Sequence, residues 1–191
     1  MKAGSLHVVC GCMFSGKSAE LTRLLRRASF ANIRVFAFKP KVDTRASNVV
    51  RSRDGQAHEA LTVDRAEEIL AAVPDVGPGL VGIDEAQFFS PAIVGVVETL
   101  LQRGYEVVCA GLDTDFRGEP FGSMPQLLAI ADDVTKLKAV CMKCLDLNAT
   151  RSQLRPGVAA PSSDEPLVLI GDQESYEARC RSCHVPPDPV P

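Results

Sequence analysis

Short apolar runs alternate along the chain with stretches in which apolar residues recur at helical spacing. Continuous apolar runs predict buried strands at residues 6–10, 33–38, 80–83, 105–110 and 134–140, and a weaker run predicts a short strand at 58–63. Helical spacing predicts helices at about residues 19–27, 65–72, 91–102 and 125–132. Because strands that alternate with helices are typical of a parallel sheet with helices on both faces, the pattern predicts an α/β fold.

Two of these helices carry start signals. Asp64 is followed three residues later by Glu67, which is the spacing of a capping box. Ser90 is followed by Pro91, which predicts an N-cap and a first-turn proline for the helix that ends near Gln102.

Three segments lack periodicity. Residues 42–56 are polar and predict a long mobile loop, which in compact domains is often functional; a solvated surface loop is the alternative. Residues 157–166 are rich in Pro, Ser and Ala and predict a flexible stretch ahead of a strand at 167–170. The proline-rich residues 185–191 predict a disordered tail.

Composition narrows the possible partners. The 191 residues suit one domain with a small appendage, and the net charge of −3 gives no strong electrostatic case for nucleic acid or an anionic membrane. No apolar stretch reaches membrane-spanning length. Gly16-Lys17-Ser18 interrupts the apolar N-terminal run, which argues against a secretory signal. We therefore expect a cytoplasmic protein.

A phosphate-binding motif follows the first predicted strand. Gly11-Cys12-Met13-Phe14-Ser15-Gly16-Lys17-Ser18 fits the P-loop pattern G-x-x-x-x-G-K-[ST]. Strand, glycine loop and helix follow one another here, and this context makes a chance glycine turn improbable. Main-chain N–H groups of such a loop bind phosphate oxygens. Lys17 supplies positive charge near the β- and γ-phosphates, and the Ser18 hydroxyl is suited to ligate Mg²⁺.

Two acids end the third long strand. Asp84 stands where P-loop proteins carry the Walker B carboxylate near Mg²⁺. Glu85 follows at the strand end, where the chain turns, so it could face the same site and act as a general base. A surface Asp-Glu pair is the alternative, and the P-loop makes the functional interpretation the stronger one.

The segment after the fourth long strand, residues 111–122, is rich in glycine and charge and includes Phe116 and Phe121. Aromatic faces here could stack on a flat base. An ordinary loop anchored in the core by phenylalanine is the alternative, and by itself it is the simpler explanation.

The seven cysteines predict one metal site in a reducing compartment. Cys141-x-x-Cys144 and Cys180-x-x-Cys183 present four thiolates, which suit one structural Zn²⁺. A redox disulfide is the weaker alternative, and the neighbouring His184 could compete as a ligand. The remaining three are expected to be small core residues at 10 and 109 and a P-loop residue at 12.

Together these motifs resemble the type II thymidine kinases over essentially the whole chain up to about residue 184. The resemblance rests on residues 11–18, the stretch Ile83-Asp84-Glu85-Ala86-Gln87-Phe88-Phe89, residues 111–118, and the cysteine pairs around Ser175-Tyr176. It implies a P-loop domain at 1–140 and a zinc-binding lobe with a lasso loop at 141–184. It also implies transfer of the ATP γ-phosphate to the 5′-hydroxyl of thymidine, and of deoxyuridine, in nucleotide salvage.

The resemblance also implies roles for individual residues. Glu85 is the base, and Mg²⁺ accompanies ATP at Ser18 and Asp84. The implied ATP and phosphate contacts are Gly11, Cys12, Met13, Phe14, Ser15, Gly16, Lys17, Ser18, Asp43, Arg45, Asp84 and Gln87. The implied nucleoside contacts are Met13, Leu112, Phe116, Phe121, Ser152, Leu167, Val168, Leu169, Ile170, Gly171 and Tyr176. Family members are commonly homotetramers that thymidine triphosphate inhibits.

Some positions depart from the family pattern. Cys12 replaces a usual Pro, Ala46 replaces a Tyr, Asp172 replaces a Gly, and Ser152 replaces a Thr. These changes bear on base selectivity more than on phosphoryl transfer. Two further hypotheses are a P-loop ATPase with a zinc lobe and a nucleic-acid-binding zinc module that uses nucleotide as a switch.

Overall fold

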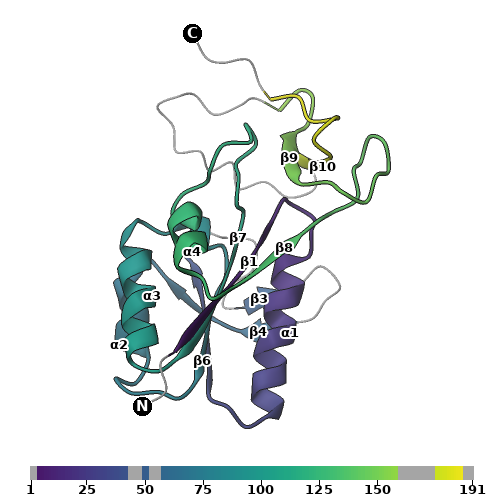
Figure 1. Ribbon diagram of the computed structural model, residues 1–191. Coiled ribbons are helices and arrows are strands. Elements are labelled where there is room, and N and C mark those ends of the chain that lie inside the picture. The colour runs from purple at the N-terminus through teal and green to yellow at the C-terminus, as the bar shows by residue number, and fades with distance from the viewer. Residues whose placement is uncertain (1–3, 43–48, 52–56, 159–174, 187–191) are drawn as a thin grey trace.

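The computed structural model describes residues 4–42, 49–51, 57–158 and 175–186 (Figure 1). Its centre is a six-stranded sheet in the order β5-β2-β6-β7-β1-β8, and every neighbouring pair in it is parallel. The strands are β1 Ser5–Gly11, β2 Val35–Pro40, β5 Leu61–Val63, β6 Leu80–Ile83, β7 Glu106–Gly111 and β8 Asp133–Leu137. The predicted parallel α/β sheet is confirmed.

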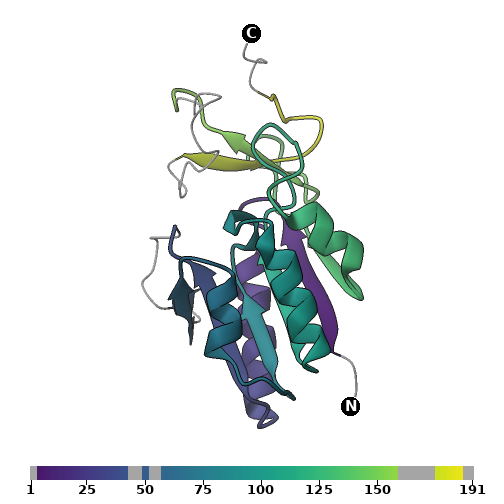
Figure 2. The ribbon, with the colours of Figure 1, turned by 90° about the vertical axis from the view of Figure 1, so that its left-hand side faces the viewer.

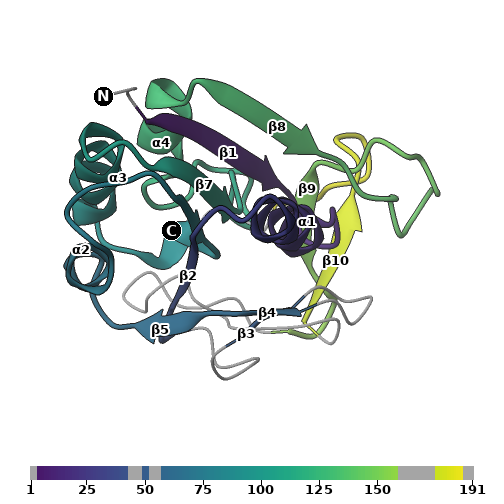
Figure 3. The same ribbon diagram turned by 90° about the horizontal axis from the view of Figure 1, so that it is seen from below.

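Helices cover both faces of the sheet, as the alternation of elements predicts (Figure 3). Helix α1 (Lys17–Phe30) packs Leu21 and Leu25 against one face. The other face carries α2 (Glu67–Ala72), α3 (Ala92–Gln102) and α4 (Met124–Ile130). Apolar side chains of all three helices join those of the strands in one buried cluster. Because the central strands are covered on both faces, their sequences are nearly continuous apolar runs.

One predicted element is wrong in outline. The expected single strand at 58–63 is divided between β4 (Ala57–Glu59) and β5, and buried Ala60 lies between them. Strand β4 pairs antiparallel with β3 (Val49–Arg51), which lies inside the stretch predicted as a loop. Val50 is buried in the cluster under α1, which gives this short hairpin an apolar anchor.

The predicted capping side chains are also wrong, although the helices are confirmed. No side chain caps α2, and the Asp64 carboxylate instead accepts from Lys41 Nζ at 2.9 Å. Glu68, in place of Glu67, accepts from the main-chain N–H of Arg65 at 3.2 Å. An ion pair and a shifted turn thus take the place of the capping box.

Helix α3 also begins without a side-chain cap. The main-chain carbonyl of Ser90 accepts from the N–H of Ile93 at 3.0 Å, so the backbone satisfies this N–H group and the serine hydroxyl does not.

A small lobe lies beyond the carboxyl ends of β1, β7 and β8 (Figure 2). It contains an antiparallel hairpin of β9 (Arg151–Leu154) and β10 (Tyr176–Arg179), which the sequence pattern did not predict. The strand predicted at 167–170 and residues 187–191 of the predicted tail lie outside the described residues. Within the described ranges, no helix has the length and apolar character needed to cross a membrane.

Candidate active site

The P-loop links β1 to α1 and requires glycine at two positions. Gly11 has a φ of +145°, and a Cβ there would lie 2.5 Å from the carbonyl oxygen of Leu137 on β8. Gly16 adopts the left-handed conformation, with φ at +91°, as the residue before α1. A side chain at Gly11 would collide with backbone, and one at Gly16 would strain the turn into the helix.

Lys17, at the start of α1, lies at the centre of the charged groups. Its Nζ donates to the carbonyl oxygen of Cys12 at 2.9 Å. Burial lowers the pKa of Lys17, and the negative charges of Glu85, Asp84 and Asp113 oppose this shift. Carboxylates at the ends of β6 and β7 therefore lie within electrostatic reach of the P-loop lysine, at the sheet edge where ligands of α/β proteins bind.

The two acids after β6 are buried, with exposed fractions of 5% for Asp84 and 8% for Glu85. Glu85 adopts the left-handed conformation with φ at +49°, and its N–H donates to Asp84 Oδ1 at 3.0 Å. This turn starts the 3₁₀ helix η1 (Ala86–Phe88). Because the chain turns at Glu85, the alternation of side chains along a strand no longer applies, and both acids stay within electrostatic reach of Lys17.

Gln87 lies in η1 and is buried between two protein partners. Its Nε2 donates to Glu85 Oε2 at 2.6 Å, and its Oε1 accepts from the N–H of Leu112 at 3.0 Å. The family resemblance alone implied that Gln87 contacts the ATP phosphates. No pattern in the sequence predicts its two observed hydrogen bonds.

Four of the expected nucleoside contacts lie together. Met13 of the P-loop, Phe116 and Tyr176 belong to one buried apolar cluster, against which Leu112 packs. Phe116 is a buried anchor, as the alternative for this loop expected, but it is anchored against the P-loop and the C-terminal lobe. Phe121 lies elsewhere, with its ring edge-on to that of Phe88 at 5.6 Å between centroids.

Direct bonds join the C-terminal lobe to the P-loop. The hydroxyl of buried Ser152 on β9 accepts from the main-chain N–H of Met13 at 3.0 Å. The thiol of Cys12 donates to the carbonyl oxygen of Ala149 at 3.3 Å. Ser152, which the resemblance placed near the thymine methyl group, thus also holds the P-loop backbone.

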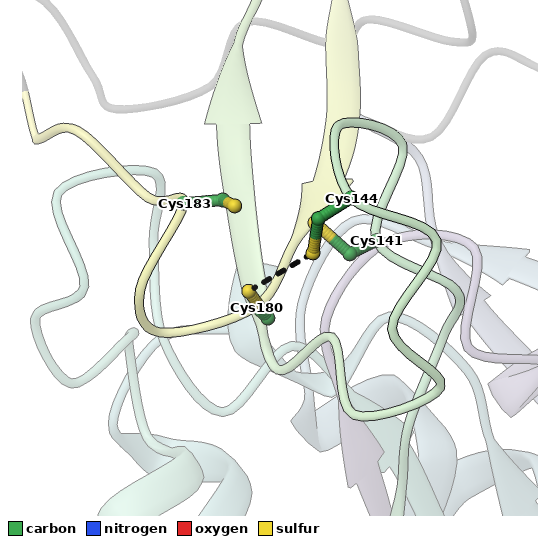
Figure 4. Close-up of side chains that lie close together, drawn as sticks. All are labelled: Cys141, Cys144, Cys180 and Cys183. Carbon is green, nitrogen blue, oxygen red and sulfur yellow. Dashed lines mark hydrogen bonds between the residues drawn. The ribbon is translucent and has the colours of Figure 1, made fainter.

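The four lobe cysteines form a cluster suited to a metal ion (Figure 4). The sulfur atoms of Cys141, Cys144, Cys180 and Cys183 all lie within 4.8 Å of one another, and those of Cys144 and Cys180 are 3.7 Å apart. A tetrahedral zinc–thiolate site with bonds of about 2.3 Å requires sulfur separations of about 3.8 Å. The donor set and its spacing therefore fit zinc.

His184 stands apart from the four thiols. Its Nε2 bonds to the carbonyl oxygen of Phe116 at 2.9 Å, so this ring joins the lobe to the loop after β7. Other expected site residues, namely Asp43, Arg45, Leu167, Val168, Leu169, Ile170 and Gly171, lie outside the described residues.

The parallel sheet, the P-loop and the buried acid pair define a P-loop α/β protein built to hold a nucleotide phosphate. Residues 4–184 match the family model described as thymidine kinase. The thymidine kinase of Mycoplasma genitalium is 49% identical over 183 residues, which cover 96% of this chain and 84% of that protein. The chain belongs to the thymidine kinase family, and the predicted family resemblance is confirmed.

Proposed function

We propose that this protein transfers the γ-phosphate of ATP to the 5′-hydroxyl of thymidine, and of deoxyuridine, to give the 5′-monophosphate. One observation carries the proposal. The P-loop supplies both Lys17, within electrostatic reach of the buried acids Asp84 and Glu85, and Met13, which lies in the apolar cluster with Phe116 and Tyr176. A phosphate site and a site for a flat, mostly apolar base are thus adjacent.

The phosphate half of the site uses main-chain N–H groups of the P-loop together with Lys17; the N–H of Met13 is excluded because it donates to Ser152. Ser18 and Asp84 would hold Mg²⁺, and the metal supplies neutralisation of phosphate charge when it is bound with ATP. By resemblance, Asp43 and Arg45 assist. Lys17 suits this role because it is partly buried at the helix N-terminus, where phosphate oxygens bind, within electrostatic reach of the acids.

In this proposal Glu85 is the general base. It takes the proton of the 5′-hydroxyl as that oxygen attacks the γ-phosphorus, and the ADP oxygen leaves on the opposite side. The buried position of Glu85 beside Asp84 and its bond to Gln87 support this role, because a base must be held within hydrogen-bond reach of the proton that it accepts.

The nucleoside half comes from three parts of the chain. Leu112, Phe116 and Tyr176 provide apolar and aromatic surface against Met13, which suits a pyrimidine ring. We assign Ser152 a supporting position at this surface through its bond to Met13, and Phe121 a more remote one through its contact with Phe88. By resemblance, the main chain of residues 167–171 reads the edge of the base.

The four lobe cysteines hold a structural zinc ion in this proposal. Four protein thiolates fill a tetrahedral site and leave no position for substrate, so the metal would stabilise the lobe without taking part in the reaction. We further propose a cytoplasmic homotetramer that thymidine triphosphate inhibits, on the family resemblance alone.

The test is incubation of the protein with labelled ATP and each of the four natural deoxynucleosides. Thymidine is expected to become a labelled monophosphate, and the others to react far more slowly. Hydrolysis of ATP at a rate that thymidine does not change would contradict the proposal and would favour a P-loop ATPase.

A further inference from the structure

Gln87 lies between the proposed base and the loop that carries the nucleoside contacts. Only 3% of its surface is exposed. Its Nε2 donates to Glu85 Oε2 at 2.6 Å, and its Oε1 accepts from the Leu112 N–H at 3.0 Å. A main-chain N–H can only donate and a carboxylate can only accept, so these partners determine which end of the amide is which.

Two glycines pack closely against Gln87, one against its side chain and one against its main chain. A Cβ on Gly111 would lie 2.6 Å from Gln87 Oε1, and one on Gly122 would lie 2.2 Å from the Gln87 carbonyl oxygen. The edge-on contact between Phe88 and Phe121 joins the same two segments. The turn after β6 and the loop after β7 therefore form one packed unit, with the amide at its centre.

We propose that Gln87 is a positioning residue that fixes the direction of the Glu85 carboxylate relative to the nucleoside pocket. A glutamate side chain rotates about several bonds, and a hydrogen bond to one carboxylate oxygen restricts the positions that the other oxygen can take. Hydrogen bonds to a charged group are about twice as strong as neutral ones. The second bond, from Leu112, ties that direction to the loop that carries Phe116.

The inference rests on the proposed function, because it takes Glu85 as the base. It differs from the resemblance, which assigns Gln87 to the phosphates. A positioning role predicts a loss in kcat, whereas a phosphate contact predicts a raised KM for ATP. A displacement of about 1 Å in a reacting group can cost about 100-fold in rate, so the expected loss is measurable.

The first experiment compares steady-state kinetics of Gln87→Met with the wild type. Methionine has a similar shape and makes neither bond. We expect kcat to fall about 10- to 100-fold, with the KM for ATP within about twofold. Gln126→Met, at an exposed position on α4, is the matched control and is expected to leave both constants unchanged.

The second variant, Gln87→Glu, separates the two bonds. It retains an acceptor for the Leu112 N–H but places a carboxylate against Glu85, which removes the donor. We expect kcat to fall at least as far as in Gln87→Met, while the KM for thymidine stays near the wild-type value. This variant keeps the test decisive if Gln87→Met does not fold.

A double variant shows whether Gln87 acts through Glu85. In a Glu85→Gln background, Gln87→Met is expected to cause little further loss, because the group that it positions is already gone. A wild-type kcat in both Gln87 variants, a raised KM for ATP as the main effect, or fully additive losses would overturn the inference. Turnover near the wild-type rate in Glu85→Gln alone would instead refute the base assignment on which the inference rests.

Discussion

The sheet and the C-terminal lobe differ in how much of their own structure holds them in place. The sheet is packed on both faces by helices, in clusters that extend along its strands. The buried cluster around the lobe cysteines is small and consists of Cys12, Ala139, Cys141, Ala149, Ala178 and Cys180, and the lobe's buried Leu154 and Tyr176 pack with Met13 and Phe116 of the sheet domain. Two residues of the small cluster are proposed metal ligands and its Cys12 belongs to the P-loop, so the cluster depends on the sheet domain and, with the proposed zinc ion bound, on the metal.

Removal of the metal is expected to give the largest effect and to confine it to the lobe. Structural zinc contributes about 10–16 kcal/mol in small zinc-binding peptides. Cys141→Ser should lose zinc and expose β9 and β10 to rapid hydrogen exchange, while β6 and β7 stay protected. Elemental analysis and exchange measured by mass spectrometry check this, and an unchanged zinc content would contradict the metal assignment.

Loss of the base should affect only chemistry. Glu85→Gln is expected to bind ATP normally and to lose about 100- to 10,000-fold in kcat, the range for loss of a general base. Steady-state kinetics and ATP titration measure the two effects. Glu106→Gln, at an exposed position on β7, is the control. Turnover near the wild-type rate in Glu85→Gln would refute the base assignment.

The contact between the two regions is tested at Ser152. Ser152→Ala leaves the buried N–H of Met13 without its acceptor, which costs about 1–3 kcal/mol. We expect a lower unfolding temperature and a raised KM for both substrates, because the P-loop tip belongs to both halves of the site. Ser152→Thr keeps the hydroxyl and should be close to the wild type. Equal losses in both variants would argue against the hydrogen bond.

Thiol labelling gives the smallest effect and compares the two regions in one sample. Burial raises the pKa of Cys10 to about 11 and that of Cys109 to about 12. A raised thiol pKa lowers the thiolate fraction at a given pH, so at pH 8 both should resist iodoacetamide. After zinc is chelated, the four lobe cysteines should label first. Labelling of Cys10 or Cys109 before the lobe cysteines would contradict the expectation that the sheet is held more firmly than the lobe.

The sequence predicted the centre of the sheet well because the central strands are buried on both faces. Strands β6 and β7 are apolar runs of a kind that only a covered strand shows. Strands β9 and β10 were missed because their sequences, RSQL and YEAR, are short and polar, and they pair with each other beside the thiol cluster. Strand β3, Val-Val-Arg, was missed because three residues are too few to show a period, and Val50 is the one among them known to be buried.

The candidate site likewise has features that the sequence predicts and features that it does not. The P-loop and the Asp84–Glu85 pair could be predicted because their chemistry is local in the sequence. The Gln87–Leu112 and Ser152–Met13 bonds could not, because they join residues 25 and 139 positions apart. Such contacts are set by the tertiary structure, and no spacing along the chain encodes them.

The contribution of Cys12 to the buried cluster of the lobe has a consequence for how such a protein can be divided. A fragment that ended at residue 140 would leave Cys12 without Ala149 and Ala178, and a fragment that began at 141 would lack the thiol. To transplant the C-terminal segment onto an unrelated nucleotide-binding scaffold, the P-loop of that scaffold would also have to be mutated to carry the residues found here at 12–14. The smallest transferable unit is discontinuous in the gene.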